Sequence, residues 1–185
     1  MDVSTCPLIK TISIGCDNTD TMSSLLLSFF EDLQSCTLSA QNLTMPITLG
    51  LIGHHETLTK LTIMDEVPNE SAMRCLQLVL KLCLHLQVLS LESIVYDMER
   101  VRKHRWGFLD LQELRVRIKD LDASQDIDRC IAQLRAWRRS GSTEGTQSLE
   151  TDTVSTRVAR HLLQFKKLTT IWLGTKVYYI RPSTA

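Results

Sequence analysis

An apolar signature, L-x-x-L-x-L, recurs six times along this chain of 185 residues and constrains its fold more than any other feature. The first positions of successive signatures are separated by 24, 25, 28, 25 and 57 residues. Such a period predicts an array of repeats in which each repeat is one supersecondary unit that buries its apolar face against its neighbours. The six signatures are Ile9/Ile12/Ile14, Leu33/Cys36/Leu38, Leu58/Leu61/Ile63, Leu86/Leu89/Leu91, Leu111/Leu114/Val116 and Leu168/Ile171/Leu173.

Each signature ends in the alternation of a half-buried strand. Leu61 and Ile63 are expected to point inward and Lys60, Thr62 and Met64 outward, because successive strand residues face opposite sides of a sheet. Consecutive strands joined by helical segments must run parallel. Together with a period close to the roughly 20 to 29 residues of leucine-rich repeats, this predicts an α/β leucine-rich repeat solenoid. Its parallel β-sheet lines the concave face and its helices lie outside.

The segments between the signatures have mixed composition. Leu43 to His55 contains Pro46, Gly50 and Gly53 and is expected to be irregular. Ser140 to Thr153 is rich in Ser, Thr, Gly and Glu, and we expect a flexible insertion that doubles the last interval, with a hidden further repeat as the competing explanation. The whole chain, 1–185, is interpreted as one domain. Helical spacing or caps predict helices at Thr21–Leu33, Glu70–Leu84, from Ser124 through Leu134, and Val154–Phe165.

Composition excludes several classes of protein. Lys and Arg total 21, as do Asp and Glu, so no strong overall field attracts nucleic acid or an anionic membrane. No secretory signal begins at Met1, and no apolar run reaches the roughly 18 residues of a spanning helix, which predicts an intracellular protein of the cytoplasm or nucleus. The six cysteines form no C-x-x-C pair and are expected to be reduced core residues.

Catalytic and metal-binding motifs are not found. His54 and His55 lie in a glycine-containing turn without ligands at metal spacing, so a solvated loop is expected there. The serines lack a G-x-S-x-G elbow, and the glycines form no phosphate-binding loop. We therefore expect no catalytic residue, no metal, no cofactor and no enzyme.

Asn42 follows the second signature at the place where leucine-rich repeats keep an asparagine. The amide of that asparagine satisfies backbone groups of the loops. Asp17, Glu66 and Ser93 take the corresponding place after other signatures, so the repeats are irregular ones.

Four segments of the second half resemble the C-terminal leucine-rich repeats of fungal F-box-like proteins: Trp106–Asp122, Ile127–Ile131, Val158–Leu168 and Ile171–Gly174. The resemblance implies substrate recognition for a cullin-type ubiquitin ligase, in which an F-box recruits the adaptor and the repeats hold the target. The first signature already begins at Ile9, and no F-box precedes it. The chain is then a shortened relative, a fragment, or a binding half that works without the ligase half.

Outward strand positions, aligned across the repeats as three columns at the third, fifth and seventh position of each signature, define the candidate binding face. Because interfaces concentrate their energy in buried aromatic and Arg anchors, Trp172, Arg115 and Arg117 are the expected hot spots, and the simpler alternative is that Trp172 packs against a C-terminal cap. The pleat aims both arginines at an acidic or mixed-charge partner protein. The full candidate set is Lys60, Thr62, Met64, Glu92, Glu113, Arg115, Arg117, Thr170 and Trp172.

Two other functions stay open. The basic segment 100–105 suggests a nucleic-acid-associated protein, although Asp97 and Glu99 beside it favour a solvated, ion-paired face. The chain is alternatively a degenerate repeat fragment without a partner. An uncapped parallel sheet leaves its edges open, so self-association through the solenoid ends is also expected.

Overall fold

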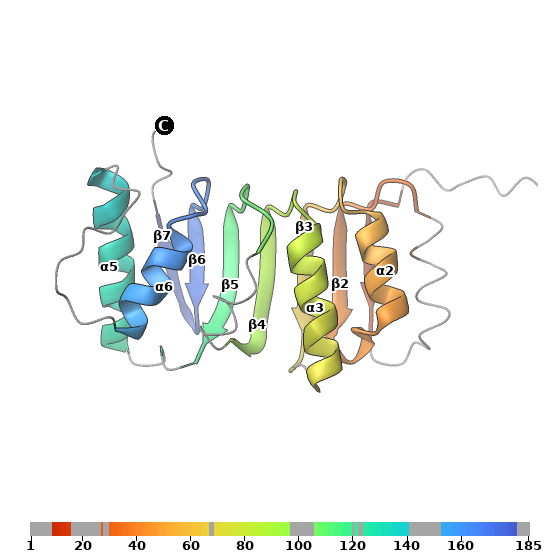
Figure 1. Ribbon diagram of the computed structural model, residues 1–185, viewed down its shortest axis with the longest axis horizontal. Helices are drawn as coiled ribbons and strands as arrows, with labels where there is room; N and C mark the ends of the chain where they lie inside the picture. Colours follow the sequence, from red (N-terminus) through yellow and green to blue (C-terminus); the bar gives the residue numbers. More distant parts are fainter. Residues whose placement is uncertain are drawn as a thin grey trace, which may run out of the picture.

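The computed structural model describes residues 9–15, 27, 30–66, 69–96, 106–119, 121, 124–140 and 153–180. In this part of the chain seven strands form one open sheet, in the order of the sequence (Figure 1). The strands are β1 (Thr11–Ile14), β2 (Ser35–Ser39), β3 (Lys60–Met64), β4 (Val88–Tyr96), β5 (Glu113–Ile118), β6 (Thr170–Leu173) and β7 (Lys176–Tyr179). The helices are η1 (Ala40–Asn42), α2 (Met45–Gly53), α3 (Glu70–Leu82), α5 (Ser124–Ser140) and α6 (Val154–Leu162).

The first six strands coincide with the six signatures and pair in parallel. The predicted α/β class with a mostly parallel sheet is therefore confirmed. The seventh strand was not expected: β7 runs antiparallel to β6 and follows it after a two-residue turn. Gly174, the first residue of this turn, has a φ of 61°, a conformation that glycine adopts without steric cost.

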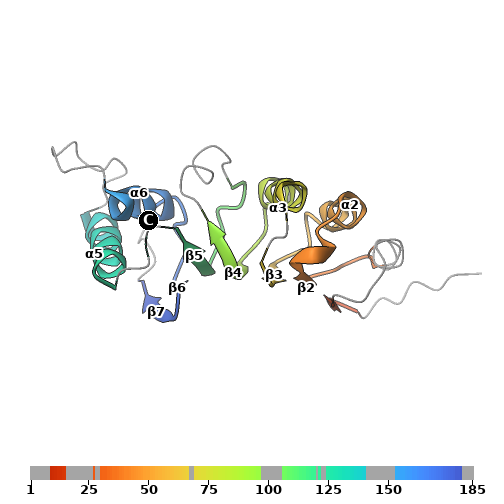
Figure 2. The same ribbon diagram turned by 90° about the horizontal axis from the view of Figure 1, so that it is seen from below.

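The helices α2, α3 and α6 lie on one side of the sheet, and α5 lies beside α6 near the β7 end (Figure 2). We call the opposite side, which carries no helix of the described residues, the strand face. The inward signature residues form continuous buried rows under the helices, because the strands pair in register. One such row consists of Cys36, Leu61, Leu89, Leu114 and Ile171, each at most 1 % exposed.

A repeated pair of backbone hydrogen bonds joins the start of each parallel strand to the start of the next. The carbonyl of the residue before a strand accepts two N–H groups from the equivalent place one signature later: Lys10 accepts from Gln34 and Ser35, at 2.9 Å each. The same arrangement of two donors recurs at four further carbonyls. The strands β2 to β6 therefore begin with the same local hydrogen-bonding geometry. These carbonyls belong to Gln34, Thr59, Gln87 and Gln112.

The expectation of an irregular segment at 43–55 was wrong, because α2 occupies Met45–Gly53. Pro46 lies in the first helical turn, where its missing N–H has no intrahelical partner to lose. Gly50 allows a close approach, since a Cβ there would lie 3.0 Å from the Leu27 Cβ. Gly53 is the last helical residue. The residues that suggested a loop are thus the start, the contact point and the end of a helix.

The other helix predictions are largely confirmed, with shifted ends. Asn69 caps α3, its side chain accepting from the Ala72 N–H at 2.9 Å, and Thr153 caps α6. Ser124 begins α5. Of the helix predicted at Thr21–Leu33, only Leu27 and residues 30–33 are described; Leu27 is helical and 30–33 are not. The predicted insertion falls on 141–152, outside the described residues; around it, between β5 and β6, the described residues form α5 and α6 and no strand.

Helix α5 holds the C-terminal end of the sheet through two arginines. Arg138 donates to the carbonyls of Phe165 and Leu168, each at 2.6 Å, and Arg135 donates to the Tyr179 carbonyl at 2.7 Å. Partial burial lowers the pKa of the Arg138 guanidinium. These contacts join α5 both to the turn after α6 and to β7.

An aromatic cluster fills the core between β5 and α6. Phe108 stacks on Phe165 with ring centroids 5.7 Å apart, and Trp106 lies 5.5 Å from Phe108. His161 packs edge-on against Trp106 and Phe165, and burial lowers its pKa to about 4. The histidine is therefore neutral at physiological pH and behaves as part of this core.

Four cysteines, Cys36, Cys75, Cys83 and Cys130, are buried free thiols, as the sequence predicted. Burial raises the pKa of Cys36, Cys83 and Cys130 to about 12, so these thiols are unreactive core residues. Among the described helices, none combines the length and apolar composition needed to cross a bilayer.

Asn42 makes the contact expected of it. The residue is 4 % exposed, and its Nδ2 donates to the Gly15 carbonyl at 2.6 Å, joining the loops that follow β2 and β1. We expect Asn42→Ala to lower the free energy of unfolding by about 1 kcal/mol, because the hydrogen bond that joins the two loops is lost. Urea denaturation followed by circular dichroism measures this loss. The matched control is Gln41→Ala, an exposed neighbour; equal losses in the two variants would contradict the role of the amide.

Candidate protein-binding surface

Of the three outward columns predicted on the strand face, the pairing register confirms two. Lys60 pairs with Val88, which pairs with Glu113, which pairs with Thr170. Register also aligns the next column, Thr62, Ser90, Arg115 and Trp172. Seven of the nine candidate residues therefore lie on one surface in the expected order: Lys60, Thr62, Met64, Glu113, Arg115, Thr170 and Trp172.

The third column, which was to contain Met64, Glu92 and Arg117, is broken. Leu91 pairs with Val116 but Val95 pairs with Arg117, so β4 advances four residues while β5 advances one, and three extra residues form a bulge. Glu92 lies in this bulge and is not opposite Arg117. Arg117 itself is exposed on the same side of β5 as Arg115, as predicted.

Arg115 is fixed by two neighbours of the strand face. Its Nε donates to Glu113 Oε1 at 2.7 Å, and its guanidinium carbon lies 4.5 Å from the centroid of the Trp172 ring. Both contacts follow from position, because Glu113 is two residues away on the same face and Trp172 is directly opposite on β6. An ion pair and a cation–π contact thus hold this side chain in one orientation.

Trp172 lies between Arg115 and the unexpected strand β7. Val177 is its partner in β7, so Trp172 also has the C-terminal hairpin as a neighbour. The ring stays half-exposed, with one neighbour from the binding column and one from the hairpin.

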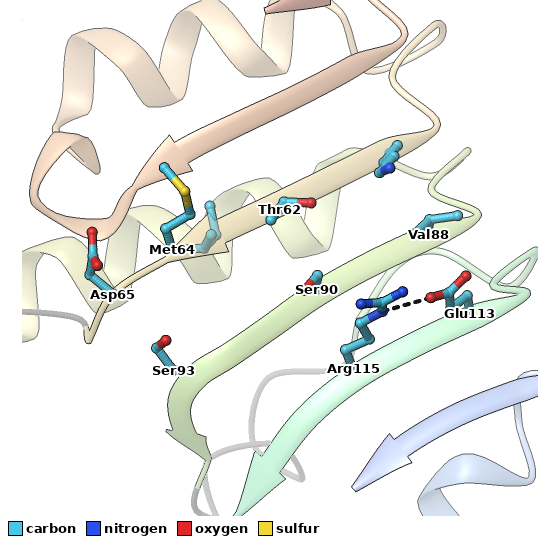
Figure 3. A pocket seen from close by; sticks show the side chains of 10 residues that line it. Thr62, Met64, Asp65, Val88, Ser90, Ser93, Glu113 and Arg115 are labelled. Atoms are coloured by element: carbon cyan, nitrogen blue, oxygen red, sulfur yellow. Dashed lines mark hydrogen bonds and ion pairs between the residues drawn. The ribbon is translucent and has the colours of Figure 1, made fainter. Parts of the chain in front are cut away.

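A groove of about 400 Å³ opens over β3, β4 and β5 (Figure 3). Small side chains of β4 form its floor: Ser90 lies between Thr62 of β3 and Arg115 of β5. Ile63 also contributes to the lining. The other lining residues are Lys60, Met64, Asp65, Val88, Ser93 and Glu113.

Sequence reasoning missed part of this surface. Val88 and Ser90 were in the outward columns, but their small size gave no reason to choose them. Asp65 and Ser93 lie beyond the regular alternation, Asp65 with a φ of 64° and Ser93 in the bulge. The signal for β7 was available: Gly174 and Thr175 precede Lys-Val-Tyr-Tyr, which is a turn followed by strand-forming residues.

The histidine pair differs from the predicted solvated loop. His54 is only 7 % exposed, and its Nε2 donates to the Leu27 carbonyl at 2.8 Å, whereas His55 is exposed. A turn that contains glycines can still be covered by a distant segment, which local composition does not reveal. Within the described residues, no group of three His, Cys, Asp or Glu side chains is arranged to hold a metal. The basic segment 100–105 lies outside the described residues.

Comparison of the chain with models of protein families, with curated proteins and with solved structures finds no match.

Proposed function

We propose that this chain is a non-enzymatic protein-interaction module whose strand face binds an acidic or mixed-charge polypeptide. The observation that carries the proposal is Arg115, held in place by Glu113 and Trp172 in the middle of an outward surface. A side chain that is already ordered loses little conformational entropy on binding, so its contacts contribute more of their energy to affinity. Arg and Trp are also the residues most enriched among binding hot spots.

The same proposal makes the chain a leucine-rich repeat solenoid. Its support is the period of the signatures, the recurring two-donor carbonyl before each strand, and the Asn42 amide that joins adjacent loops. Helices lie on one side of the sheet only, which leaves the strand face available to a partner (Figure 2).

The resemblance of roughly Trp106–Tyr179 to fungal F-box-like proteins suggests the biological setting. In this proposal the strand face holds a target protein for a cullin-type ubiquitin ligase, inside the cell. Co-purification from native cells tests the setting separately from the binding: the expected result is a target together with a cullin adaptor. Co-purification of a target without the adaptor would support the binding function and contradict the ligase role.

The triple variant Arg115→Ala, Arg117→Ala, Trp172→Ala tests the surface. We expect partner capture to fall by roughly a hundred-fold or more, because several hot-spot side chains are lost together, while the circular dichroism spectrum stays unchanged. Capture is measured by quantitative affinity purification. Arg74→Ala, an exposed arginine of α3 on the helix side, is the matched control and should retain binding. Undiminished capture by the triple variant would remove this site assignment.

A further inference from the structure

The groove over β4 has a direction, because each of its ends is marked by different side chains. At the end where the strands begin, Lys60 and Glu113 flank Val88 as direct strand partners. Near the end where β3 stops, Met64, Asp65 and Ser93 line the groove, as Figure 3 shows. Thr62, Ser90 and Arg115 lie between the two ends.

The charges of the groove are separated along its length. Glu113, at the Lys60 end, is paired with Arg115 at 2.7 Å, so these two charges largely offset each other. Lys60 is exposed and forms no ion pair with another described residue. At the opposite end the Asp65 carboxylate is oriented by the Ser39 hydroxyl, which donates to it at 3.0 Å. The groove therefore presents a cation at one end and an anion at the other.

From this arrangement we infer that the groove binds an extended segment of a partner protein that carries an acidic residue at the Lys60 end and a basic residue at the Asp65 end. The inference rests on the proposed function and specifies the ligand of that surface. The hydroxyls of Thr62, Ser90 and Ser93 contact polar backbone groups of the segment, and Met64 and Val88 contact its apolar side chains.

The spacing of the two charges on the ligand follows from β3. Lys60 and Asp65 are five residues apart, which corresponds to roughly 16 Å along a strand. Two residues of an extended segment face the same side when their sequence positions differ by an even number. An acidic and a basic residue four or six positions apart therefore match the groove. A ligand with only one charged residue can pair with Lys60 or with Asp65, but not with both.

The experiment is selection from a library of random linear ten-residue peptides on the immobilised full chain. We expect the selected peptides to carry Asp or Glu and Lys or Arg four or six positions apart. Lys60→Glu should exchange the acidic preference for a basic one, with at least a ten-fold change in enrichment. Asp65→Asn, which keeps a residue tolerant of positive φ, should remove the basic preference alone. Lys166→Glu, an exposed lysine outside the groove, is the control and should select the same peptides as the unchanged chain.

Failure to select a paired-charge sequence, or selection that is the same for Lys60→Glu and the unchanged chain, would overturn the inference. The proposed function has a separate readout. Partner capture that depends on Arg115, Arg117 and Trp172 but is unaffected by Lys60→Glu would keep the strand face as the binding surface and reject the groove as the place where the segment lies.

Discussion

Phe165→Ala is expected to lower the free energy of unfolding by about 3–5 kcal/mol, as removal of a fully buried Phe generally does. Phe165 is 0 % exposed and contacts three other rings: Phe108 at 5.7 Å, Trp106 at 5.9 Å and His161 at 5.7 Å between centroids. The rings are held by separate backbone segments, so they are not expected to close the cavity left by the missing one.

Urea denaturation monitored by circular dichroism and tryptophan fluorescence measures the effect of Phe165→Ala. Trp106 lies in the cluster and should report its loosening. Leu109→Ala is the matched control, because Leu109 is 59 % exposed in the same region and its removal should change stability by about 0.5 kcal/mol or less. A similar loss for both variants would show that the aromatic cluster is not the core of this end of the sheet.

Gly107→Ala is expected to destabilise the chain by about 3 kcal/mol, at the upper end of overpacking effects. A Cβ at this position would clash with the Lys81 carbonyl oxygen and would lie 2.7 Å from Leu84 Cδ2. The first of these atoms is backbone at the end of α3, so the clash is relieved only if the segment moves. Movement would also break the hydrogen bond from the Gly107 N–H to the Leu80 carbonyl, 3.0 Å long.

Gly53→Ala provides the comparison for Gly107→Ala, because no atom lies within 4 Å of a Cβ at Gly53. Its thermal midpoint should stay the same or rise slightly, since alanine in a helix is favoured over glycine. If Gly107→Ala melts at the same temperature as Gly53→Ala, the close approach to α3 does not exist in solution.

Phe165→Ala and Gly107→Ala both affect residues 106–112, the described segment that precedes β5. Gly107 packs on the end of α3, and Trp106 packs on His161 of α6, so the segment connects two helices that follow different strands. It leads directly into β5, which carries Glu113 and Arg115. Stability of this segment therefore supports the position of the Arg115–Trp172 pair.

The sequence alone determined the first six strands and most of the candidate surface. Strand alternation is a property of the backbone, and a repeated signature places equivalent residues in register once the strands are parallel. For this reason Lys60, Glu113, Arg115 and Trp172 were placed correctly without coordinates. The Asn42 contact was predicted because Asn42 follows its signature at the place where leucine-rich repeats keep an asparagine.

Only the tertiary structure decided the features that depend on distant contacts. Gly50 allows Leu27 to pack against α2, and His54 is buried where its Nε2 donates a hydrogen bond to the Leu27 carbonyl. The bulge that displaces Glu92 arises from unequal lengths of β4 and β5. The groove exists because a small residue, Ser90, lies between larger ones contributed by neighbouring strands. The period of the apolar residues can be read along the chain, because it is local. The depth of the groove, the burial of a side chain and the pairing register of the strands depend on which distant residues the fold brings together.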